Sequence, residues 1–264
     1  MLHAESGGSG PRIVLAHGFT QTARSWGRFG ELLESSHEVV RVDLPGHGGS
    51  AAVRADLVRS AELLLEAASP APAGRAGDTG GTEDTGGTEG EQCDVVGYSL
   101  GARVALHAVL SRPERVRRLV LIGGTAGIED PAAREARRQR DEELAEQAQA
   151  DVEGFLERWV AAPMFAGLRD PGLEERRRNS ADGLASSLRL AGTGTQLPLW
   201  DRLGDISCPV LALAGADDVR FALAAGRIAR LVPRGAFSLV AGAGHAAHLA
   251  QPEICAAIVE RFLA

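Results

Sequence analysis

The chain has 264 residues, of which 44% are hydrophobic, so it can bury one sizeable α/β core but offers little material for a second domain. A formal net charge of −7 disfavours nonspecific binding to nucleic acid, even though all 28 basic residues are arginine. The apolar runs are too short to cross a bilayer, and the N-terminus does not resemble a secretory signal. We therefore expect a soluble, cytoplasmic protein with no nucleic-acid or membrane partner.

Apolar runs that lead into glycine recur in the first half of the chain, beginning with PRIVLAHGF at 11–19 and HEVVRVDLPGHGGS at 37–50. Such runs are typical of buried strands in a parallel sheet. Further strands are expected at 93–99 and 118–124, and helical stretches such as ARVALHAVLSR follow several of them. This β-α-β-α order predicts an α/β fold with a mostly parallel sheet and helices on both faces.

Two segments interrupt this alternation. Residues 69–91 contain the hexamer DTGGTE twice in tandem and almost no large apolar side chains, which predicts a flexible surface loop. Residues 127–203 are polar and helical: EDPAAREARRQRDEELAEQAQADVEGFLERW predicts one or two amphipathic helices, and LEERRRNSADGLASSLRLAG predicts a further group. Because this second segment lies between two strand-rich halves, we expect a helical cap inserted above the sheet.

The alternation resumes after the cap. CPVLALAGADD at 208–218 and GAFSLVAGAGH at 235–245 predict two more strands, and PEICAAIVERFLA predicts a closing helix. We therefore expect a core made of residues 1–126 and 204–264, with the cap at 127–203.

The cysteines Cys93, Cys208 and Cys255 lie far apart, without the spacing of a zinc site, and their odd number fits reducing surroundings. We expect all three cysteines to be small core residues rather than members of a disulfide framework.

The pentapeptide Gly97-Tyr98-Ser99-Leu100-Gly101 fits G-x-S-x-G, follows a predicted strand and precedes a predicted helix. This is the context of a nucleophile elbow, in which a sharp turn exposes the serine hydroxyl at the carboxyl edge of the sheet. The pattern predicts that Ser99 is a nucleophile or base rather than part of an ordinary tight turn.

A serine hydroxyl near neutral pH needs an imidazole beside it and a carboxylate to orient the ring. His245 follows the last strand, and Asp217 and Asp218 follow the strand before it, which is the Ser-Asp-His order of this type of site. The spacing from Gly215 favours Asp218, and we expect Asp217 to be a solvated or helix-capping residue.

The remaining histidines are assigned to structural roles. We expect His3 and His37 to be exposed, His107 to lie on a helix surface, and His248 to be structural or at the rim of the pocket. His17 and His47 lie in the loops that follow the first two strands and are expected to support them.

Two backbone N–H groups are expected to stabilise a developing oxyanion. One belongs to Leu100, directly after the nucleophile, and the other to Phe19, in the loop after the first predicted strand.

Together these segments resemble the 2-succinyl-6-hydroxy-2,4-cyclohexadiene-1-carboxylate synthases, pyruvate-eliminating enzymes of menaquinone biosynthesis with an α/β-hydrolase fold. The most diagnostic features are an arginine four residues after the serine, the W-x-x-x-P-x-F segment at 159–165 and the R-x-x-N-x-x-x-x-L-A run at 176–185. The resemblance is carried by HGFTQTARSW (17–26), VDLPGHGGSAA (42–52), GYSLGAR (97–103), FLERWVAAPMFAGL (155–168), RRRNSADGLASSLRLAGTGTQ (176–196), GADDVRF (215–221) and AGHAAH (243–248).

The resemblance implies a small anionic substrate with three carboxylates, which the bidentate, permanently charged guanidinium suits. It assigns substrate binding to Arg103, Arg137 and Arg176, with Trp159 packing against the ligand and Tyr98 either contacting substrate or packing. Arg103 stands one helical turn after Ser99 and would project toward the same pocket. The other cap arginines are expected to lie on solvated helix faces: Arg134, Arg138, Arg140, Arg177 and Arg178.

The implied reaction is an elimination. Asp218 orients His245, Ser99 removes a ring proton, and the two N–H groups hold the enolate while pyruvate leaves, without a metal or organic cofactor. Two alternatives use the same fold: a hydrolase that cleaves a carboxylic ester or a C–C bond of a dienone acid, and a ligand- or partner-binding protein without catalysis.

Overall fold

The computed structural model describes residues 1–69, 91–168 and 170–264, and a seven-stranded sheet forms its centre, in the order β1-β3-β2-β4-β5-β6-β7. All neighbouring strands are parallel except β1, which pairs antiparallel with β3 at one edge. The strands are β1 Ala4–Gly7, β2 Arg12–Ala16, β3 Glu38–Val42, β4 Cys93–Tyr98, β5 Val116–Ile122, β6 Val210–Gly215 and β7 Gly235–Val240.

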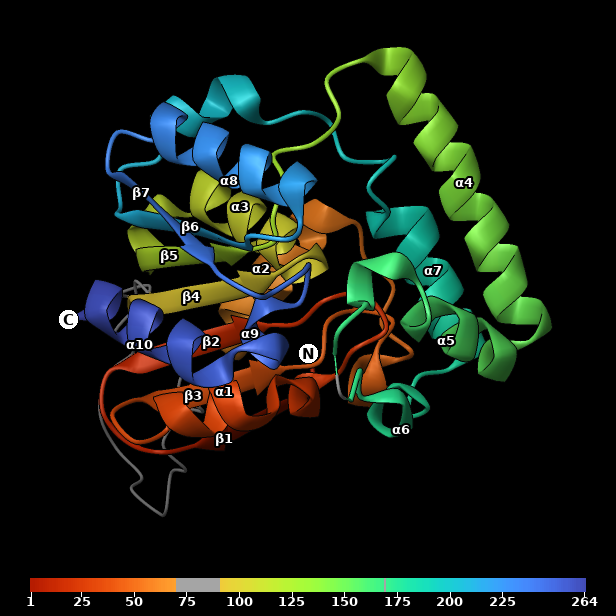
Figure 1. Cartoon of the computed structure of the whole chain (residues 1–264), viewed down its shortest axis with the longest axis horizontal. Helices are drawn as coiled ribbons and strands as arrows, with labels where there is room; N and C mark the ends of the chain where they lie inside the picture. Colours follow the sequence, from red (N-terminus) through yellow and green to blue (C-terminus); the bar gives the residue numbers. More distant parts are fainter. Residues whose placement is uncertain (70–90, 169) are drawn as a thin grey trace, which may run out of the picture.

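Helices cover both faces of the sheet (Figure 1). Alternate residues of a strand point to opposite faces, so Val14 and Ala16 join one hydrophobic cluster while Ile13 and Leu15 join another. The first cluster packs against α2 (Leu57–Ala67), α3 (Leu100–Ser111) and α8 (Val219–Leu231). The second packs against α1 (Gly27–Leu33), α9 (Ala247–Ala250) and α10 (Pro252–Leu263).

Four helices lie between β5 and β6 in the chain and gather at one end of the sheet (Figure 1). Each longer one begins at a side-chain cap: Asp130 accepts from the Ala133 N–H, Asp151 from the Gly154 N–H and Ser180 from the Gly183 N–H. We call these four helices the cap helices: α4 Pro131–Ala150, α5 Val152–Val160, α6 Leu173–Arg176 and α7 Ala181–Ala191. The short 3₁₀ helices of the described residues are Ala23–Trp26, Gly48–Ser50, Pro113–Arg115, Pro163–Phe165 and Trp200–Asp205.

The predicted parallel sheet with helices on both faces is confirmed, and all six predicted strands are present. The prediction missed β1, because AESG has no β-branched or aromatic residue and forms a strand only through pairing with β3. The long amphipathic stretch forms two helices, α4 and α5. The DTGGTE repeat of the predicted loop lies outside the described residues. Within residues 1–69, 91–168 and 170–264, every helix is too short or too polar to span a membrane.

Candidate active site

Ser99 lies at a strained turn between β4 and α3. Its backbone has φ 52° and ψ −103°, a region that residues other than glycine rarely occupy. This turn requires glycine at position 101, because a Cβ there would overlap the carbonyl oxygen of Ala16. The geometry is that of a nucleophile elbow.

The structure brings Ser99, His245 and Asp218 into one chain of hydrogen bonds. His245 Nε2 lies 3.0 Å from Ser99 Oγ, and His245 Nδ1 lies 2.8 Å from Asp218 Oδ2. The three side chains come from the ends of β4, β6 and β7, which meet at the carboxyl edge of the sheet. The choice of Asp218 over Asp217 is consistent with this geometry, since Asp217 is exposed.

Asp218 also holds the N-terminus of α8, where its Oδ1 accepts a hydrogen bond from the Phe221 N–H at 3.3 Å. The capping role expected of Asp217 therefore belongs to Asp218. Partial burial alone would raise the pKa of Asp218, but the hydrogen bond to His245 and the electrostatic interaction with its ring, with smaller contributions from the Phe221 N–H and Arg220, lower the pKa below its usual value. Asp218 is consequently an anion at neutral pH.

The N–H groups of Phe19 and Leu100 have no hydrogen-bond acceptor within the described part of the chain. The loop that carries Phe19 is attached to the elbow, because the Gly101 N–H donates to the His17 carbonyl oxygen at 3.0 Å. Thr20, next to Phe19, has a φ of 65°, so the loop turns sharply at this point. Both N–H groups thus remain free to donate to a bound ligand.

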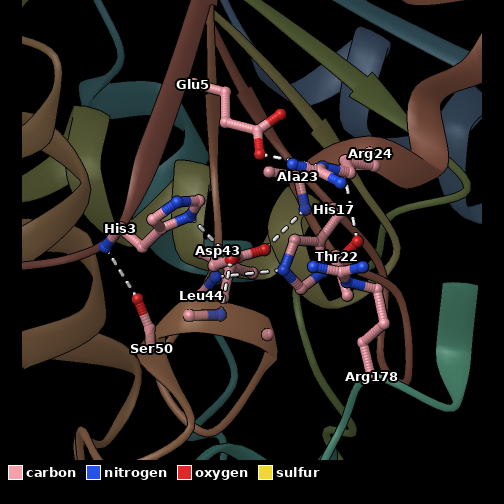
Figure 2. Close-up of polar contacts among 12 residues, drawn as sticks. His3, Glu5, His17, Thr22, Ala23, Arg24, Asp43, Leu44, Ser50 and Arg178 are labelled. Atoms are coloured by element: carbon pink, nitrogen blue, oxygen red, sulfur yellow. Dashed lines mark hydrogen bonds and ion pairs between the residues drawn. The ribbon is translucent and has the colours of Figure 1, made fainter.

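A buried polar network braces this loop against the one after β3 (Figure 2). His17 Nε2 accepts from the Leu44 N–H at 3.0 Å, and Asp43 Oδ1 accepts from the Ala23 N–H at 2.6 Å. His47 Nε2 accepts from the Thr20 N–H at 3.3 Å. Burial lowers the pKa of His17 to about 4 and that of His47 to about 3, so both rings are neutral and able to accept.

A cavity of about 530 Å³ opens above Ser99 and His245. Its core wall consists of residues from the strand ends and from α3 and α8, and its cap wall of residues from the cap helices and the loops next to them. Apolar side chains such as Phe155, Leu144 and Phe221 alternate with polar ones. The polar set includes five arginines and, among the described residues, no aspartate or glutamate: Arg103, Arg137, Arg140, Arg158 and Arg220.

Arg103 is a buried cation in this cavity, with only 6% of its surface exposed. Its Nη1 donates to the carbonyl oxygens of Ala191 at 2.8 Å and Gly192 at 3.2 Å, at the end of α7, and it forms no ion pair with a described carboxylate. Burial, with a contribution from the charge of Arg137, lowers the pKa of Arg103 to about 10. A buried positive charge without a carboxylate partner is costly, and an anionic ligand would compensate it.

Arg137 reaches the same cavity from α4. Its Nε donates to Asp141 Oδ1 at 2.7 Å, and its two Nη atoms have no hydrogen-bond partner among the described residues. Asp141 is 1% exposed, and its Oδ2 accepts from the Gly194 N–H at 2.9 Å. This acid fixes the guanidinium by one edge and leaves the opposite edge for a ligand.

Comparison with known proteins identifies the family of this chain. The model of the "Alpha/beta hydrolase family" matches residues 13–258. A 2-succinyl-6-hydroxy-2,4-cyclohexadiene-1-carboxylate synthase from Serratia proteamaculans is 32% identical over 84% of this chain and 81% of its own. The synthase of the same name from Salmonella schwarzengrund is 30% identical over 96% of this chain and 94% of its own.

The chain belongs to this synthase family within the α/β hydrolases. The solved structure of MenH from S. aureus superposes with a TM-score of 0.84 at 26% identity and covers 100% of this chain and 98% of the other. The resemblance drawn from the sequence motifs is confirmed.

Two residues that the family resemblance assigned to substrate binding do not line the cavity of this synthase family member. Arg176 is 1% exposed and donates through Nη1 to Thr20 Oγ1 and to the Phe19 carbonyl oxygen, beside the loop rather than in the cavity wall. Tyr98 is 2% exposed and packs 4.4 Å from the His248 ring, measured between ring centroids. The two roles predicted for Tyr98 were contact with substrate and packing, and in the structure its side chain packs in the core. Trp159 does line the cavity, and its ring lies edge-on to Phe19.

Four residues of the site escaped the sequence analysis. Arg140, predicted to lie on a solvated face, lines the cavity, as do Arg158 and Arg220. Buried Asp141 was not singled out either. The available signal was the placement of Arg220 two residues after Asp218, which brings it to the carboxyl edge of the sheet.

Of the expectations for other residues, the one for His37 was wrong, because His37 is buried rather than exposed. His3 is exposed as predicted, and its Nδ1 is paired with Asp43 Oδ2 at 2.9 Å. His248 is buried away from the cavity lining, as the structural alternative required. All three cysteines are free and buried. In the part of the chain that the structure describes, no cluster of three or more acidic, histidine or cysteine side chains is placed to hold a metal ion.

Proposed function

We propose that this protein eliminates pyruvate from 2-succinyl-5-enolpyruvyl-6-hydroxy-3-cyclohexene-1-carboxylate, giving 2-succinyl-6-hydroxy-2,4-cyclohexadiene-1-carboxylate in menaquinone biosynthesis. The observation that carries the proposal is the combination of a Ser-His-Asp arrangement with a cavity that, among the described residues, is lined by arginines and by no acid, in a member of this synthase family. The substrate has three carboxylates, and such a cavity favours a polyanion over a neutral ester.

In the proposed mechanism, Ser99 is the base. His245 accepts the hydroxyl proton, and Asp218 stabilises the imidazolium that forms. The serine oxygen removes the ring proton next to the succinyl ketone, and the N–H groups of Phe19 and Leu100 stabilise the resulting enolate oxygen. When the enolate collapses, its electrons move through the ring double bond and break the C–O bond to the enolpyruvyl group. The leaving enolpyruvyl oxygen takes up the proton held by the His245 imidazolium, while Ser99 keeps the ring proton as its hydroxyl hydrogen. The released enol then tautomerises to pyruvate.

We assign Arg103 and Arg137 to two of the substrate carboxylates. Arg103 lacks an ion-pair partner, and Arg137 has two Nη atoms without one. Trp159, whose indole N–H is buried without an acceptor, packs against the ring. The division into a core at 1–126 and 204–264 and a cap at 127–203 stays a prediction about folding units.

The test supplies the enolpyruvyl precursor, generated enzymatically, and follows pyruvate with lactate dehydrogenase and NADH. We expect pyruvate to form in proportion to the substrate consumed, at a rate proportional to protein concentration, and the Ser99→Ala variant to serve as the control. A rate no higher than that of the uncatalysed sample would contradict the proposal.

The hydrolase alternative uses the same Ser99, His245 and free N–H groups, with water as a second substrate. Burst release of the alcohol from a small aryl ester, at a rate typical of a dedicated esterase, would favour it. Binding of the precursor without any turnover would favour the non-catalytic alternative.

A further inference from the structure

Three arginines of the cavity have no role in the proposed reaction: Arg140, Arg158 and Arg220. They come from different elements, since Arg140 lies on α4, Arg158 on α5 and Arg220 on α8. They line the same cavity as Ser99, although they lie far apart in the sequence. All three side chains are exposed, which places them toward the solvent side of the two inner arginines, Arg103 and Arg137.

The proposed substrate has one carboxylate more than the inner arginines can accommodate. Arg176, to which the family resemblance also assigned substrate binding, does not line the cavity and directs its Nη1 to the Phe19 loop. We propose that Arg140, Arg158 and Arg220 form an outer anion subsite, which binds one carboxylate of a small polycarboxylate substrate while Arg103 and Arg137 bind the others. This inference rests on the proposed function for the identity of the substrate.

Charge is distributed unevenly over this protein, in a way that favours such a subsite. The whole chain is acidic, with 35 aspartates and glutamates against 28 arginines, yet none of these acids lines the cavity within the described residues. A positively charged opening in a protein of net negative charge attracts small anions and orients them on approach.

Arg220 is the member best placed to contact substrate. It follows Asp218 by two residues at the start of α8, its guanidinium carbon lies 5.5 Å from the centre of the Phe221 ring, and that ring is 4.4 Å from His245. Arg220 forms no ion pair with any described carboxylate. Burial raises the pKa of Asp218, and His245 and the Phe221 N–H lower it; the charge of Arg220 adds a smaller lowering effect.

Arg140 and Arg158 have acidic neighbours, but these are weak competitors. Arg140 Nη1 lies 2.6 Å from Glu143 Oε2, with both side chains 57% exposed. Arg158 Nη1 is 3.8 Å from Asp151 Oδ2, at similar exposure. Exposed pairs of this kind contribute little, because water screens them and both side chains lose freedom. A ligand carboxylate can therefore replace either acid.

The experiment compares Arg140→Gln, Arg158→Gln, Arg220→Gln and the triple variant with two matched controls. Arg138→Gln removes an α4 arginine that makes the same i,i+3 pair, with Glu135, but does not line the cavity. Arg230→Gln removes an exposed arginine from α8. We expect each outer variant to raise KM for the precursor roughly two- to fivefold, the triple variant to raise it roughly 10- to 100-fold, and the controls to change it by less than about twofold.

Calorimetry with simple carboxylates tests the subsite without turnover. Tricarballylate carries three carboxylates and glutarate two, so the triple variant should weaken binding of tricarballylate much more than that of glutarate. If the triple variant weakened binding of tricarballylate and glutarate equally, the three arginines would act through the overall electrostatic potential of the cavity rather than as a subsite, and the inference would be overturned. A triple variant with a KM within about twofold of wild type, or a wild-type protein that does not bind tricarballylate, would also overturn it.

The two proposals fail separately. If wild-type protein releases no pyruvate but the triple variant selectively loses tricarballylate binding, the proposed function is wrong and the subsite stands. If pyruvate is released normally by the triple variant with unchanged KM, the subsite is wrong and the function stands.

Discussion

The two walls of the cavity are built in different ways. In the core wall, Ser99, His245 and the Phe19 loop are held by backbone geometry and buried hydrogen bonds, including the positive φ of Ser99 and the bond from Gly101 to His17. In the cap wall, Arg137 and Arg140 project from an amphipathic helix whose other face meets solvent. On the proposed mechanism, the core wall holds the reacting groups, and the cap wall binds the substrate carboxylates together with Arg103 and Arg220 of the core wall.

If the core wall performs the chemistry, its variants should show the largest effects. Ser99→Ala and His245→Ala should each lower kcat by about 10³-fold or more, because either change breaks the proton transfer. Asp217→Asn, next to Asp218 but exposed, is the matched control and should retain normal turnover. Steady-state kinetics together with thermal melting separates loss of chemistry from loss of fold. Wild-type turnover in either variant would remove Ser99 and His245 from the mechanism.

Arg103 lies where the two walls meet, since it starts on α3 and bonds to the end of α7. Arg103→Ala should lose about 2 to 5 kcal/mol of transition-state stabilisation, the scale for removing one partner of a buried charge pair. The measurement is kcat/KM with the enolpyruvyl precursor. Arg103→Lys should recover only part of the loss, because an ammonium lacks the bidentate fork. A change below about 1 kcal/mol would assign Arg103 to packing of the cap alone.

Substitution of Asp141 tests whether the cap wall depends on the ion pair between Asp141 and Arg137. Asp141→Asn should lower the free energy of unfolding by about 1 to 3 kcal/mol and raise KM, because Arg137 loses the acid that orients it. The adjacent Glu142→Gln, which breaks only an exposed pair with Arg189, is the control and should cost less than about 1 kcal/mol.

The effect of Asp141 on KM should pass through Arg137. In an Arg137→Ala background, Asp141→Asn should therefore no longer change KM, although it should still lower the melting temperature. An undiminished effect on KM in that background would show that Asp141 acts on the cavity by another route.

The same contrast explains what the sequence could predict. Ser99, Asp218 and His245 follow strands whose apolar runs are recognisable, so their convergence at one sheet edge follows from topology. For the cap arginines, the sequence could not distinguish those that line the cavity from those that face solvent. Arginines at 134, 137, 138 and 140 point around α4, and only the packing of α4 on α7 decides which of them reach the cavity.

Other misses have the same physical origin. Asp141 pairs with Arg137 at i,i+4, a spacing that in sequence is indistinguishable from a solvated surface pair. Arg176 is flanked by two glutamates, at 174 and 175, and two arginines, at 177 and 178, yet it alone of these five residues is buried, because α6 packs near the Phe19 loop. Long-range packing, which no local pattern encodes, decides both cases.

The smallest effect on turnover is expected from His248, which braces the core wall without lining the cavity. Its ring packs among Trp26, Phe29 and Tyr98, and neither ring nitrogen has a hydrogen-bond partner among the described residues. Burial lowers the pKa of His248 to about 3, so between pH 6.5 and that value the unfolded chain binds a proton that the folded chain does not. The free energy of unfolding must therefore fall as the pH is lowered through this window.

His248→Leu removes that proton uptake, so its stability should fall less steeply with decreasing pH. Between pH 7 and pH 5 the variant should lose about 2 kcal/mol less than wild type, since each pH unit below 6.5 corresponds to about 1.4 kcal/mol for one such histidine. Urea unfolding at the two pH values measures the difference. His17 and His47, with lowered pKa values of their own, should keep part of the slope in the variant. Parallel stability curves for the two proteins would mean that the His248 ring takes up its proton in the folded state, and that the core wall is more open to water at this point than its packing indicates.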